Sequence, residues 1–342
     1  MDSANAFALI DALAGRRVTV VGDVVADEFV YGRVARVSRE APVLILEYDS
    51  TQVVPGGAGN AANNVAALGG AATLVSVVGR DEPGRRLMAA LHQRVNARHV
   101  VRLAGRATTV KTRILAGGVH SAKQQVVRID RIAPRPPDAN TCAAALKAAL
   151  TAACRSDAVL VSDYGGGLVS PAFVSALRAG LRRARHPVPI LVDSRHRLLA
   201  YRGLTACTPN ESEVEQALGL TIDDDARVLE RAGRTILERT KMQAVLVTRG
   251  SRGMALFVRR APTVHIPIFG SDEIADVTGA GDTVVATVTL ALAAGATFEQ
   301  AARLANCAGG LVVMKRGTAM VSASELREAV AAGDTGGAGR RG

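Results

Sequence analysis

Residues 276–283, which read Asp-Val-Thr-Gly-Ala-Gly-Asp-Thr, form the segment of this sequence best suited to chemistry. An apolar run follows them, so the Gly-Ala-Gly turn is expected to open a helix and to present backbone N–H groups at its positive end. Asp282 would lie in the first turn, where a carboxylate takes the proton of a substrate hydroxyl. The amides of Gly279, Ala280 and Gly281 would meanwhile hold a transferring phosphoryl group. The alternative is a structural turn in which Asp282 caps the helix.

A second glycine-rich segment, at 55–64, reads Pro-Gly-Gly-Ala-Gly-Asn-Ala-Ala-Asn-Asn. It contains a G-x-G-x-x-A match, but a dinucleotide site would place this match directly after the first strand, which is expected to end near Val21. We therefore interpret the glycines, among them Gly56 and Gly57, together with Asn60 and Asn64, as groups that approach sugar hydroxyls closely. A tight loop followed by a helix N-cap is the alternative.

Polar residues also follow three other expected strands. Asp23 and Asp27 come after the first strand, where α/β sheets bind ligands, although a solvated loop acid is equally compatible with this pattern. Asn210 and Glu213 have the spacing of a capping box, and they would also suit water-mediated contacts to Mg²⁺. The glycine turn at 248–253 suits nucleotide phosphates or a plain hairpin. A Walker A motif, a protein-kinase motif set and a G-x-S-x-G motif are all absent from the sequence.

These segments need a scaffold, and the pattern of the remaining chain predicts an α/β fold. Short apolar runs lie at 18–21, 73–78, 158–161, 189–192 and 244–247. Between them lie helix candidates at 60–68, 82–91, 141–153, 171–185 and 212–218. The alternation predicts a parallel sheet with crossover helices, buried on both faces. The last third is mostly helical, at 282–294, 298–313 and 323–331, and the Gly- and Arg-rich end at 333–342 is predicted to be disordered.

Three stretches, at 43–54, 108–115 and 124–129, are strand-like but are not connected by helices. The last two predict a hairpin. Strands of this kind would form a small accessory sheet, within about residues 30–54 and 107–130, that covers a cleft as a lid. An edge extension of the main sheet is the alternative.

Composition excludes several classes of protein. The chain has 342 residues, of which 48% are apolar and 21% charged, so wholesale disorder is excluded. No run of 18 apolar residues occurs, and the N-terminus lacks the pattern of a secretory signal. The net charge of +11 comes from arginines spread along the chain without interleaved aromatics, which argues against a nucleic-acid partner. The four cysteines form no C-x-x-C pair, so free thiols in the cytoplasm are expected.

Taken together and in this order, the motifs resemble those of the ribokinase (PfkB) family of carbohydrate kinases, from about Arg17 to Val330. Within the family, local matches at 20–24, 38–43, 124–125, 160–164, 201–203 and 208–210 are most similar to the D-glycero-β-D-manno-heptose 7-phosphate kinases. The resemblance implies one domain over residues 15–332, a three-layer α/β/α sandwich with a small β-sheet lid that often forms a homodimer. It implies ATP, Mg²⁺ and often a monovalent cation such as K⁺, and phosphorylation of the sugar phosphate at O1 to a 1,7-bisphosphate.

The resemblance also implies roles for individual residues. Asp282 is the base, beside the anion hole of Gly279, Ala280 and Gly281. The substrate-binding positions are Asp27, Gly56, Gly57 and Asn60, with basic residues for the 7-phosphate at Arg36, Lys111, Arg113 and Arg128. The nucleotide and Mg²⁺ positions are Asn210, Glu213, Thr248, Gly250, Gly253 and Asn306. The monovalent cation is assigned to Asp276 and Thr278.

Two departures leave the sugar open. The heptose kinases usually read Asp-Tyr-Ala-Lys-Gly where residues 163–167 read Asp-Tyr-Gly-Gly-Gly, and Asp-Pro-Lys where residues 193–195 read Asp-Ser-Arg. The residues of phosphoryl transfer are unaffected by these changes. A kinase for another sugar, sugar phosphate or nucleoside, and a non-catalytic sugar- or nucleotide-binding protein, are therefore the alternatives.

Overall fold

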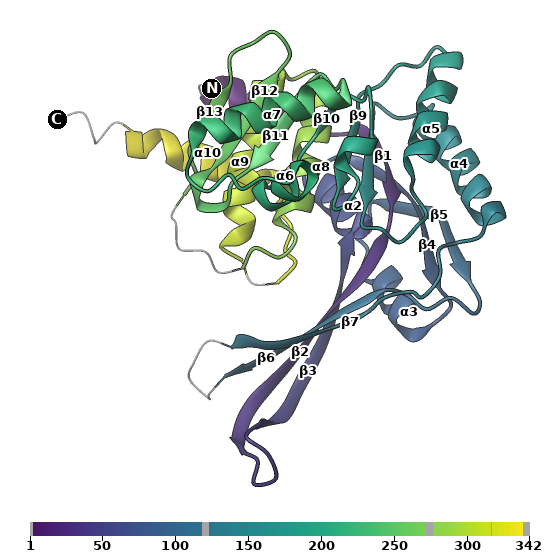
Figure 1. Ribbon diagram of the computed structural model, residues 1–342, viewed down its shortest axis with the longest axis vertical. Helices are drawn as coiled ribbons and strands as arrows, with labels where there is room; N and C mark the ends of the chain where they lie inside the picture. Colours follow the sequence, from purple (N-terminus) through teal and green to yellow (C-terminus); the bar gives the residue numbers. More distant parts are fainter. Residues whose placement is uncertain (1–2, 118–122, 271–275, 316, 338–342) are drawn as a thin grey trace.

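The computed structural model of the chain describes residues 3–117, 123–270, 276–315 and 317–337, which form two β-sheets (Figure 1). The order of strands across the larger sheet is β13 (Val264–Ile266), β12 (Met254–Val258), β11 (Ala244–Thr248), β10 (Ala206–Cys207), β9 (Ile190–Ser194), β8 (Ala158–Asp163), β1 (Arg17–Gly22), β4 (Ala71–Gly79) and β5 (Val95–Leu103). Neighbours from β11 to β5 run parallel, whereas β12 and β13 are antiparallel additions at one edge. The carboxyl ends of the parallel strands therefore meet along one edge.

Helices cover both faces of this sheet, which explains why its central strands are apolar throughout. One face packs against α1 (Ser3–Ala12), α2 (Ala58–Ala67), α8 (Ala280–Ala293), α9 (Phe298–Val313) and α10 (Ala323–Gly337). The other face packs against α4 (Ala139–Ala153), α5 (Pro171–Arg183), α6 (Glu211–Leu218) and α7 (Ala226–Thr240). In β8, Leu160 belongs to the first core, and its neighbours Val159 and Val161 belong to the second, as the period of a strand requires.

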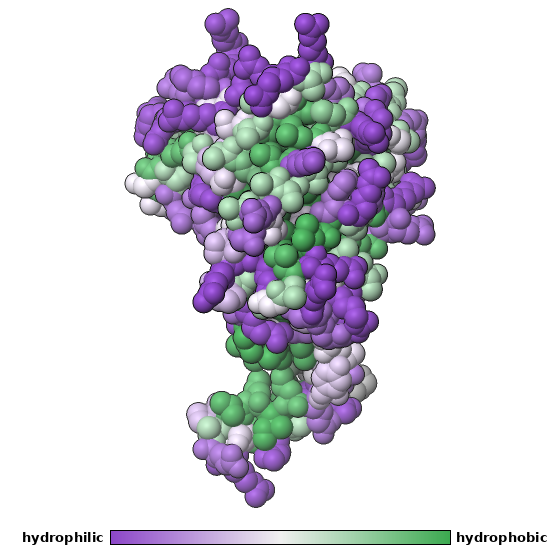
Figure 2. Space-filling view, turned by 90° about the vertical axis from the view of Figure 1, so that its right-hand side faces the viewer, coloured by the Kyte–Doolittle hydropathy of each residue, from purple (hydrophilic) through white to green (hydrophobic). Residues whose placement is uncertain are grey.

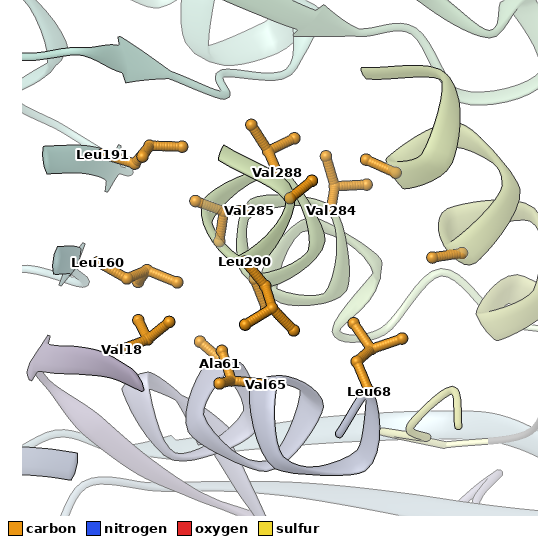
Figure 3. Packing of buried hydrophobic residues seen from close by; sticks show 14 of the residues in the cluster. Val18, Ala61, Val65, Leu68, Leu160, Leu191, Val284, Val285, Val288 and Leu290 are labelled. Atoms are coloured by element: carbon orange, nitrogen blue, oxygen red, sulfur yellow. The ribbon is translucent and has the colours of Figure 1, made fainter. Parts of the chain in front are cut away.

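Helix α8 is deeply buried in the core. Its residues from Asp282 to Ala291 are all buried, as expected of a helix that is apolar on every side. Figure 3 shows Val285 and Leu290 between the strand residues Leu160 and Leu191 on one side and α2 on another. This packing fixes the position of the first turn of α8 relative to the sheet.

The second sheet is the lid, with strand order β3 (Leu44–Gly57), β2 (Val24–Val37), β6 (Val110–Gly117) and β7 (Gln124–Arg131). It projects from the layered body (Figure 1), and α3 (Glu82–Ala89) packs at the junction. The predicted three-layer sandwich with a small lid is confirmed, and the lid is not an edge extension of the main sheet. The hairpin prediction matches β6 and β7, which pair antiparallel, while residues 118–122 of its turn lie outside the described residues.

Two boundaries differ from the sequence-based expectation. Strand β2 already begins at Val24, because the chain leaves β1 and enters the lid almost without a turn. Helix α10 continues to Gly337, so the segment predicted to be disordered from residue 333 is helical in part, and residues 338–342 lie outside the described residues.

Two features bear on the chemistry of the whole chain. The cysteines at 142, 154, 207 and 307 are all free thiols. In the described part of the chain, no helix combines the length and the apolar character that crossing a membrane requires.

Candidate functional site

A cavity of about 370 Å³ opens where the carboxyl ends of the parallel strands face the lid, which is where open α/β sheets bind ligands. Residues of β2, β6 and β7 line it on one side, and residues at or after the ends of β8, β9, β10 and β11 line it on the other. The start of α8 closes the cavity. The lining residues are Asp27, Gly57, Lys111, Arg113, Arg128, Tyr164, Asp193, Arg195, Thr208, Asn210, Glu213, Thr248, Val277, Thr278, Gly279, Gly281 and Asp282.

Asp282 lies at the centre of this site, in the first turn of α8. Its side chain is buried, and its two carboxylate oxygens accept hydrogen bonds from different elements. Asn60 Nδ2 donates to Oδ2 at 2.9 Å, and the Tyr164 hydroxyl donates to Oδ1 at 3.0 Å. Two donors therefore fix the carboxylate in one orientation, one from α2 and one from the segment after β8.

The environment of Asp282 prepares it to accept a proton. Burial raises its pKa to about 7, although the hydrogen bonds from Asn60 and Tyr164 act in the opposite direction. The nearby carboxylate of Asp27 raises the pKa further, and Lys111 lowers it. Burial also raises the pKa of Tyr164 well above its ordinary value, so this hydroxyl stays protonated and remains a donor. A carboxyl group with a pKa near neutrality is well matched to general-base catalysis.

The glycine turn before Asp282 offers part of the predicted anion hole. Gly279 has φ 80° and ψ 2°, a conformation that favours glycine, and it precedes the first helical residue. The N–H of Ala280 donates to the Val277 carbonyl oxygen at 3.2 Å, so this amide is engaged within the turn. Gly281 lines the cavity, and a Cβ there would meet no protein atom within 4 Å. Of the three predicted amides, that of Ala280 is therefore engaged within the turn, and the anion-binding role of Gly279 and Gly281 stays a prediction.

The structure brings the predicted sugar-binding residues of the lid side together, and two of them, Asp27 and Arg113, bind each other. Asp27 and Arg113 form a buried ion pair, with 2.6 Å between Arg113 Nη1 and Asp27 Oδ1. Gly56 does not line the cavity; a Cβ there would lie 2.2 Å from Asp27 Oδ2, so the glycine makes room for this carboxylate. Gly57 does line the cavity, at φ 57°.

The other basic residues that were predicted to bind the phosphate of the sugar differ in their location and in whether they form ion pairs. Lys111 Nζ lies 5.1 Å from the ring centroid of Tyr164, and burial and then Arg195 lower its pKa. Arg128 also lines the cavity and pairs with Asp130 at 2.5 Å. Arg36 does not reach the cavity of its own chain. It is exposed on the outer part of β2, nine residues beyond Asp27, or roughly 30 Å along an extended strand.

The predicted nucleotide side is only partly in the cavity. Asn210 and Glu213 both line it, and they also form the capping box that opens α6, so the capping-box prediction is confirmed and the Mg²⁺ role stays a prediction. Thr248 lines it at the end of β11. The remaining predicted positions lie outside the lining: Gly250 and Gly253 flank the short 3₁₀ helix η2 (Gly250–Arg252), and Asn306 Nδ2 donates to the Pro267 carbonyl oxygen at 2.8 Å. Their nucleotide roles stay predictions.

The predicted monovalent-cation residues lie on the loop before α8. The Asp276 carboxylate accepts hydrogen bonds from the backbone N–H groups of Thr278 at 2.8 Å and Gly317 at 3.0 Å, so it organises this loop. Thr278 lines the cavity. Across the described residues, no group of three or more His, Cys, Asp or Glu side chains could hold a metal ion by itself. The cation role of Asp276 and Thr278 stays a prediction.

Apart from Val277, four lining residues were not predicted as site residues: Tyr164, Asp193, Arg195 and Thr208. Burial, followed by Glu213 and Asp282, raises the pKa of Asp193 well above its ordinary value. The Thr208 hydroxyl is buried without a hydrogen-bond partner among the described residues. All four follow or end β8, β9 or β10, and this position at the carboxyl end of a parallel strand is the signal that would have identified them.

Comparisons with known proteins agree with this geometry. The model of the "pfkB family carbohydrate kinase" matches residues 16–325. The "Bifunctional protein HldE" of Caulobacter vibrioides is 44% identical over 95% of this chain, and that of Gluconacetobacter diazotrophicus is 42% identical over 90%. The chain spans 65% and 62% of the length of these two relatives.

Solved structures share the fold. The ribokinase of Arabidopsis thaliana, solved with ribose and ATP, has a TM-score of 0.70 at 20% identity, covering 93% of this chain and 99% of that one. Phosphofructokinase-2 of Escherichia coli, solved with potassium, has a TM-score of 0.69 at 18% identity with the same coverage. These two likenesses support the architecture alone.

Proposed function

Because the chain belongs to the PfkB family of carbohydrate kinases, we propose that it transfers the γ-phosphoryl group of ATP to O1 of D-glycero-β-D-manno-heptose 7-phosphate. The observation that carries the proposal is the buried, doubly hydrogen-bonded Asp282 beside Gly281, which lines the cavity in the first turn of α8. The motifs similar to heptose 7-phosphate kinases and the identity of 44% and 42% to the two bifunctional relatives support the choice of sugar.

In the proposed reaction, the acceptor hydroxyl donates its proton to the Asp282 carboxylate. The acceptor oxygen then forms a bond to the γ-phosphorus, and the bond between this phosphorus and the bridging oxygen breaks. ADP leaves with that electron pair. The amide of Gly281 would donate a hydrogen bond to the transferring phosphoryl oxygens, which carry the developing charge. Asn60 and Tyr164 would keep Asp282 aligned with the attacking hydroxyl.

The donor set of the cavity fits Mg²⁺. Asp193 and Glu213 both line it as carboxylates without a cationic partner within ion-pair distance in the described structure, and the unpartnered Thr208 hydroxyl lies nearby in the same lining. Mg²⁺ takes one or two carboxylates together with substrate phosphates, which agrees with the lack of a complete protein cage among the described residues. Bound there, the ion would neutralise charge on the nucleotide phosphates.

A phosphorylated acceptor fits the charge of the lid side. Lys111 is not paired with a carboxylate in the described structure, and Arg128 faces the same cavity. A sugar that carries its own phosphate would satisfy these cations while its hydroxyls approach Asp27 and Asn60. An uncharged sugar would leave the positive charge of Lys111 without a partner.

We also propose that two copies associate through their lids. All eight residues of the edge strand β7 are exposed, and the apolar side chains of Val127 and Ile129 are 44% and 50% exposed. Exposed apolar side chains also occur at Val37 and Tyr48 of β2 and β3, and Figure 2 shows hydrophobic residues gathered over the narrow lower part of the molecule. Such strands are normally covered.

The experiment that tests the proposed function measures ADP release with ATP and Mg²⁺ over a sugar panel. The panel contains D-glycero-β-D-manno-heptose 7-phosphate, fructose 6-phosphate, fructose 1-phosphate, ribose and adenosine. We expect kcat/KM for the heptose phosphate to exceed the others by at least about 100-fold, since buried polar groups left unpaired by a wrong substrate cost this much. Preference for another member would retain the kinase and discard the heptose. No release with any member, from folded protein, would favour a non-catalytic binding protein.

A further inference from the structure

Among the arginines that line the cavity, Arg195 is the one without an ion pair in the described part of the chain. It follows β9, its side chain is exposed, and it lines both the main cavity and an adjoining hollow of about 410 Å³. In the described part of the chain, its guanidinium forms neither an ion pair nor a hydrogen bond, whereas Arg113 and Arg128 are paired with Asp27 and Asp130. A free guanidinium at the mouth of a cavity is available to an anionic ligand.

The order of strands places Arg195 between the two proposed substrates. The residues proposed for the acceptor, Asp27 and Asn60, lie on the side of the lid and α2. Those proposed for the nucleotide and Mg²⁺, Asn210 and Thr248, follow β10 and β11. Strand β9 lies between β8 and β10, so a side chain that leaves its carboxyl end faces the region where a phosphoryl group passes from nucleotide to acceptor.

The backbone around Arg195 is held firmly even though its side chain is free. The Arg195 N–H donates to the Asp163 carbonyl oxygen at 3.1 Å. The buried Asp163 carboxylate accepts hydrogen bonds from the Ser194 hydroxyl at 2.9 Å, the Tyr201 hydroxyl at 2.6 Å and Arg197 Nη2 at 2.7 Å. Residues on both sides of Arg195 are therefore anchored to the end of β8. This rigidity is what a group that must point at a short-lived species requires.

The charges around Arg195 limit what it can bind. Asp193, Glu213 and Asp282 make the sheet side of the cavity acidic, and Arg195 lowers the pKa values of the first two. Arg195 also lowers the pKa of Lys111, so the two cations are close enough to interact. An anion between them would relieve their repulsion. The planar guanidinium can donate two parallel hydrogen bonds to phosphoryl oxygens, which the lysine of the heptose kinases cannot do.

We propose that Arg195 binds the transferring phosphoryl group in the transition state, from the side opposite the amides at the start of α8. This inference rests on the proposed kinase function and adds a residue to it. It assigns Arg195 to the group in transfer and not to the phosphate that the acceptor already carries. The two assignments differ in which kinetic constant depends on Arg195.

The test compares Arg195→Ala and Arg195→Lys with the wild type and with Arg155→Ala, which removes an exposed arginine that precedes β8 at the opposite edge of the sheet. For Arg195→Ala we expect kcat to fall about 100- to 1000-fold, with both KM values within about threefold of the wild type, because a group that acts in the transition state changes kcat. Arg195→Lys should recover part of the loss, and millimolar guanidinium should partly rescue Arg195→Ala. Arg155→Ala should behave as the wild type.

Two kinetic results and one binding result would overturn the inference. A raised KM for the sugar phosphate with unchanged kcat would assign Arg195 to the acceptor's own phosphate, and unchanged constants would make it a bystander. If the wild type releases no ADP with any sugar, the proposed function fails on its own. In that case a second measurement still tests Arg195. Aluminium fluoride mimics the transferring group, and the thermal stabilisation that it gives together with ADP and Mg²⁺ is compared between the wild type and Arg195→Ala. Equal stabilisation of both proteins would overturn the role of Arg195, and loss of it in the variant alone would support the role.

Discussion

At the scale of single residues, the site depends on one carboxyl group whose environment opposes its charge. Burial raises the pKa of Asp282 to about 7, and Asn60 and Tyr164 direct its two oxygens. We expect Asp282→Asn to fold normally and to lower kcat by about 100- to 10,000-fold, because an amide cannot accept the proton. ADP release under saturating substrates measures this. Asp223→Asn, at an exposed position, serves as the control, and equal turnover of all three proteins would remove Asp282 as the base.

The pH dependence of the reaction follows from the same group. A base must be ionised, so kcat/KM should be low below pH 7 and should rise as the pH passes the pKa of Asp282, about 7. Tyr164→Phe removes a donor that stabilises the carboxylate, and this raises the pKa. The rise in kcat/KM should therefore move to higher pH by about one unit. Tyr48→Phe, on the exposed part of the lid, should leave the profile unchanged. A profile that Tyr164→Phe does not move would show that this hydrogen bond is irrelevant to the base.

Sequence analysis could identify residues that share a motif, but not residues that meet only in space. Asp282 and Asn60 were predicted because each lies in a glycine-rich segment, and the structure joins them although they are 222 residues apart. Tyr164 and Arg195 stand alone after their strands, and only the order of strands brings them to the cavity. The pairing of Arg113 with Asp27 was equally invisible, because it depends on the register of β2 and β6.

At the scale of elements, the turn into α8 has to be glycine at Gly279 for two reasons. Its φ of 80° disfavours other residues, and an added Cβ would lie 2.6 Å from Asn60 Nδ2. We expect Gly279→Ala to destabilise the fold by about 1–2 kcal/mol. We also expect it to lower kcat by about 10- to 100-fold, since Asn60 must move away from Asp282.

Gly295, near the other end of α8, is the matched control for that prediction. Its φ is 90°, but a Cβ there meets no atom within 4 Å. Gly295→Ala should therefore show a similar loss of stability in chemical denaturation with an unchanged kcat. If both variants kept full activity, the contact between Gly279 and Asn60 would not matter for alignment of the base.

Apolar runs predicted the central strands of the main sheet, whereas the hairpin of β6 and β7 was predicted although both of its strands carry charged residues. The central strands β1, β4, β8, β9 and β11 are apolar runs, because helices cover both of their faces. Strand β2 carries Asp27, Glu28, Arg33 and Arg36 within its 14 residues. The sequence pattern therefore predicted no strand over its first half. Its charges are tolerated because Asp27 and Glu28 are paired with arginines, and Arg33 and Arg36 are exposed. In β2, charged residues interrupt the apolar pattern from which a strand is predicted.

At the scale of the whole molecule, the cavity exists because two sheets share one continuous chain. Strand β1 of the main sheet ends at Gly22, and β2 of the lid begins at Val24. The carboxyl edge of one sheet is thereby held against the base of the other, and Asp27 and Lys111 of the lid reach the same cavity as Asp193 and Asp282. Among the described residues, nothing covers the long outer part of the lid, which is exposed. We therefore expect the outer part of the lid to contact another molecule.

A second copy of the chain is the partner that we expect for the lid. The edge strand β7 has free hydrogen-bonding groups along one side, and Val127 and Ile129 alternate on one of its faces. Sedimentation at micromolar concentration should give twice the 35.4 kDa of one chain. The double variant Val127→Lys and Ile129→Lys should give the mass of one chain, because charged side chains cannot be buried unpaired between two lids. Met314→Lys, which changes an exposed apolar residue of the main body, should sediment as the wild type. A wild type that sediments as one chain, or a double variant that stays paired, would exclude this face of the lid as the interface.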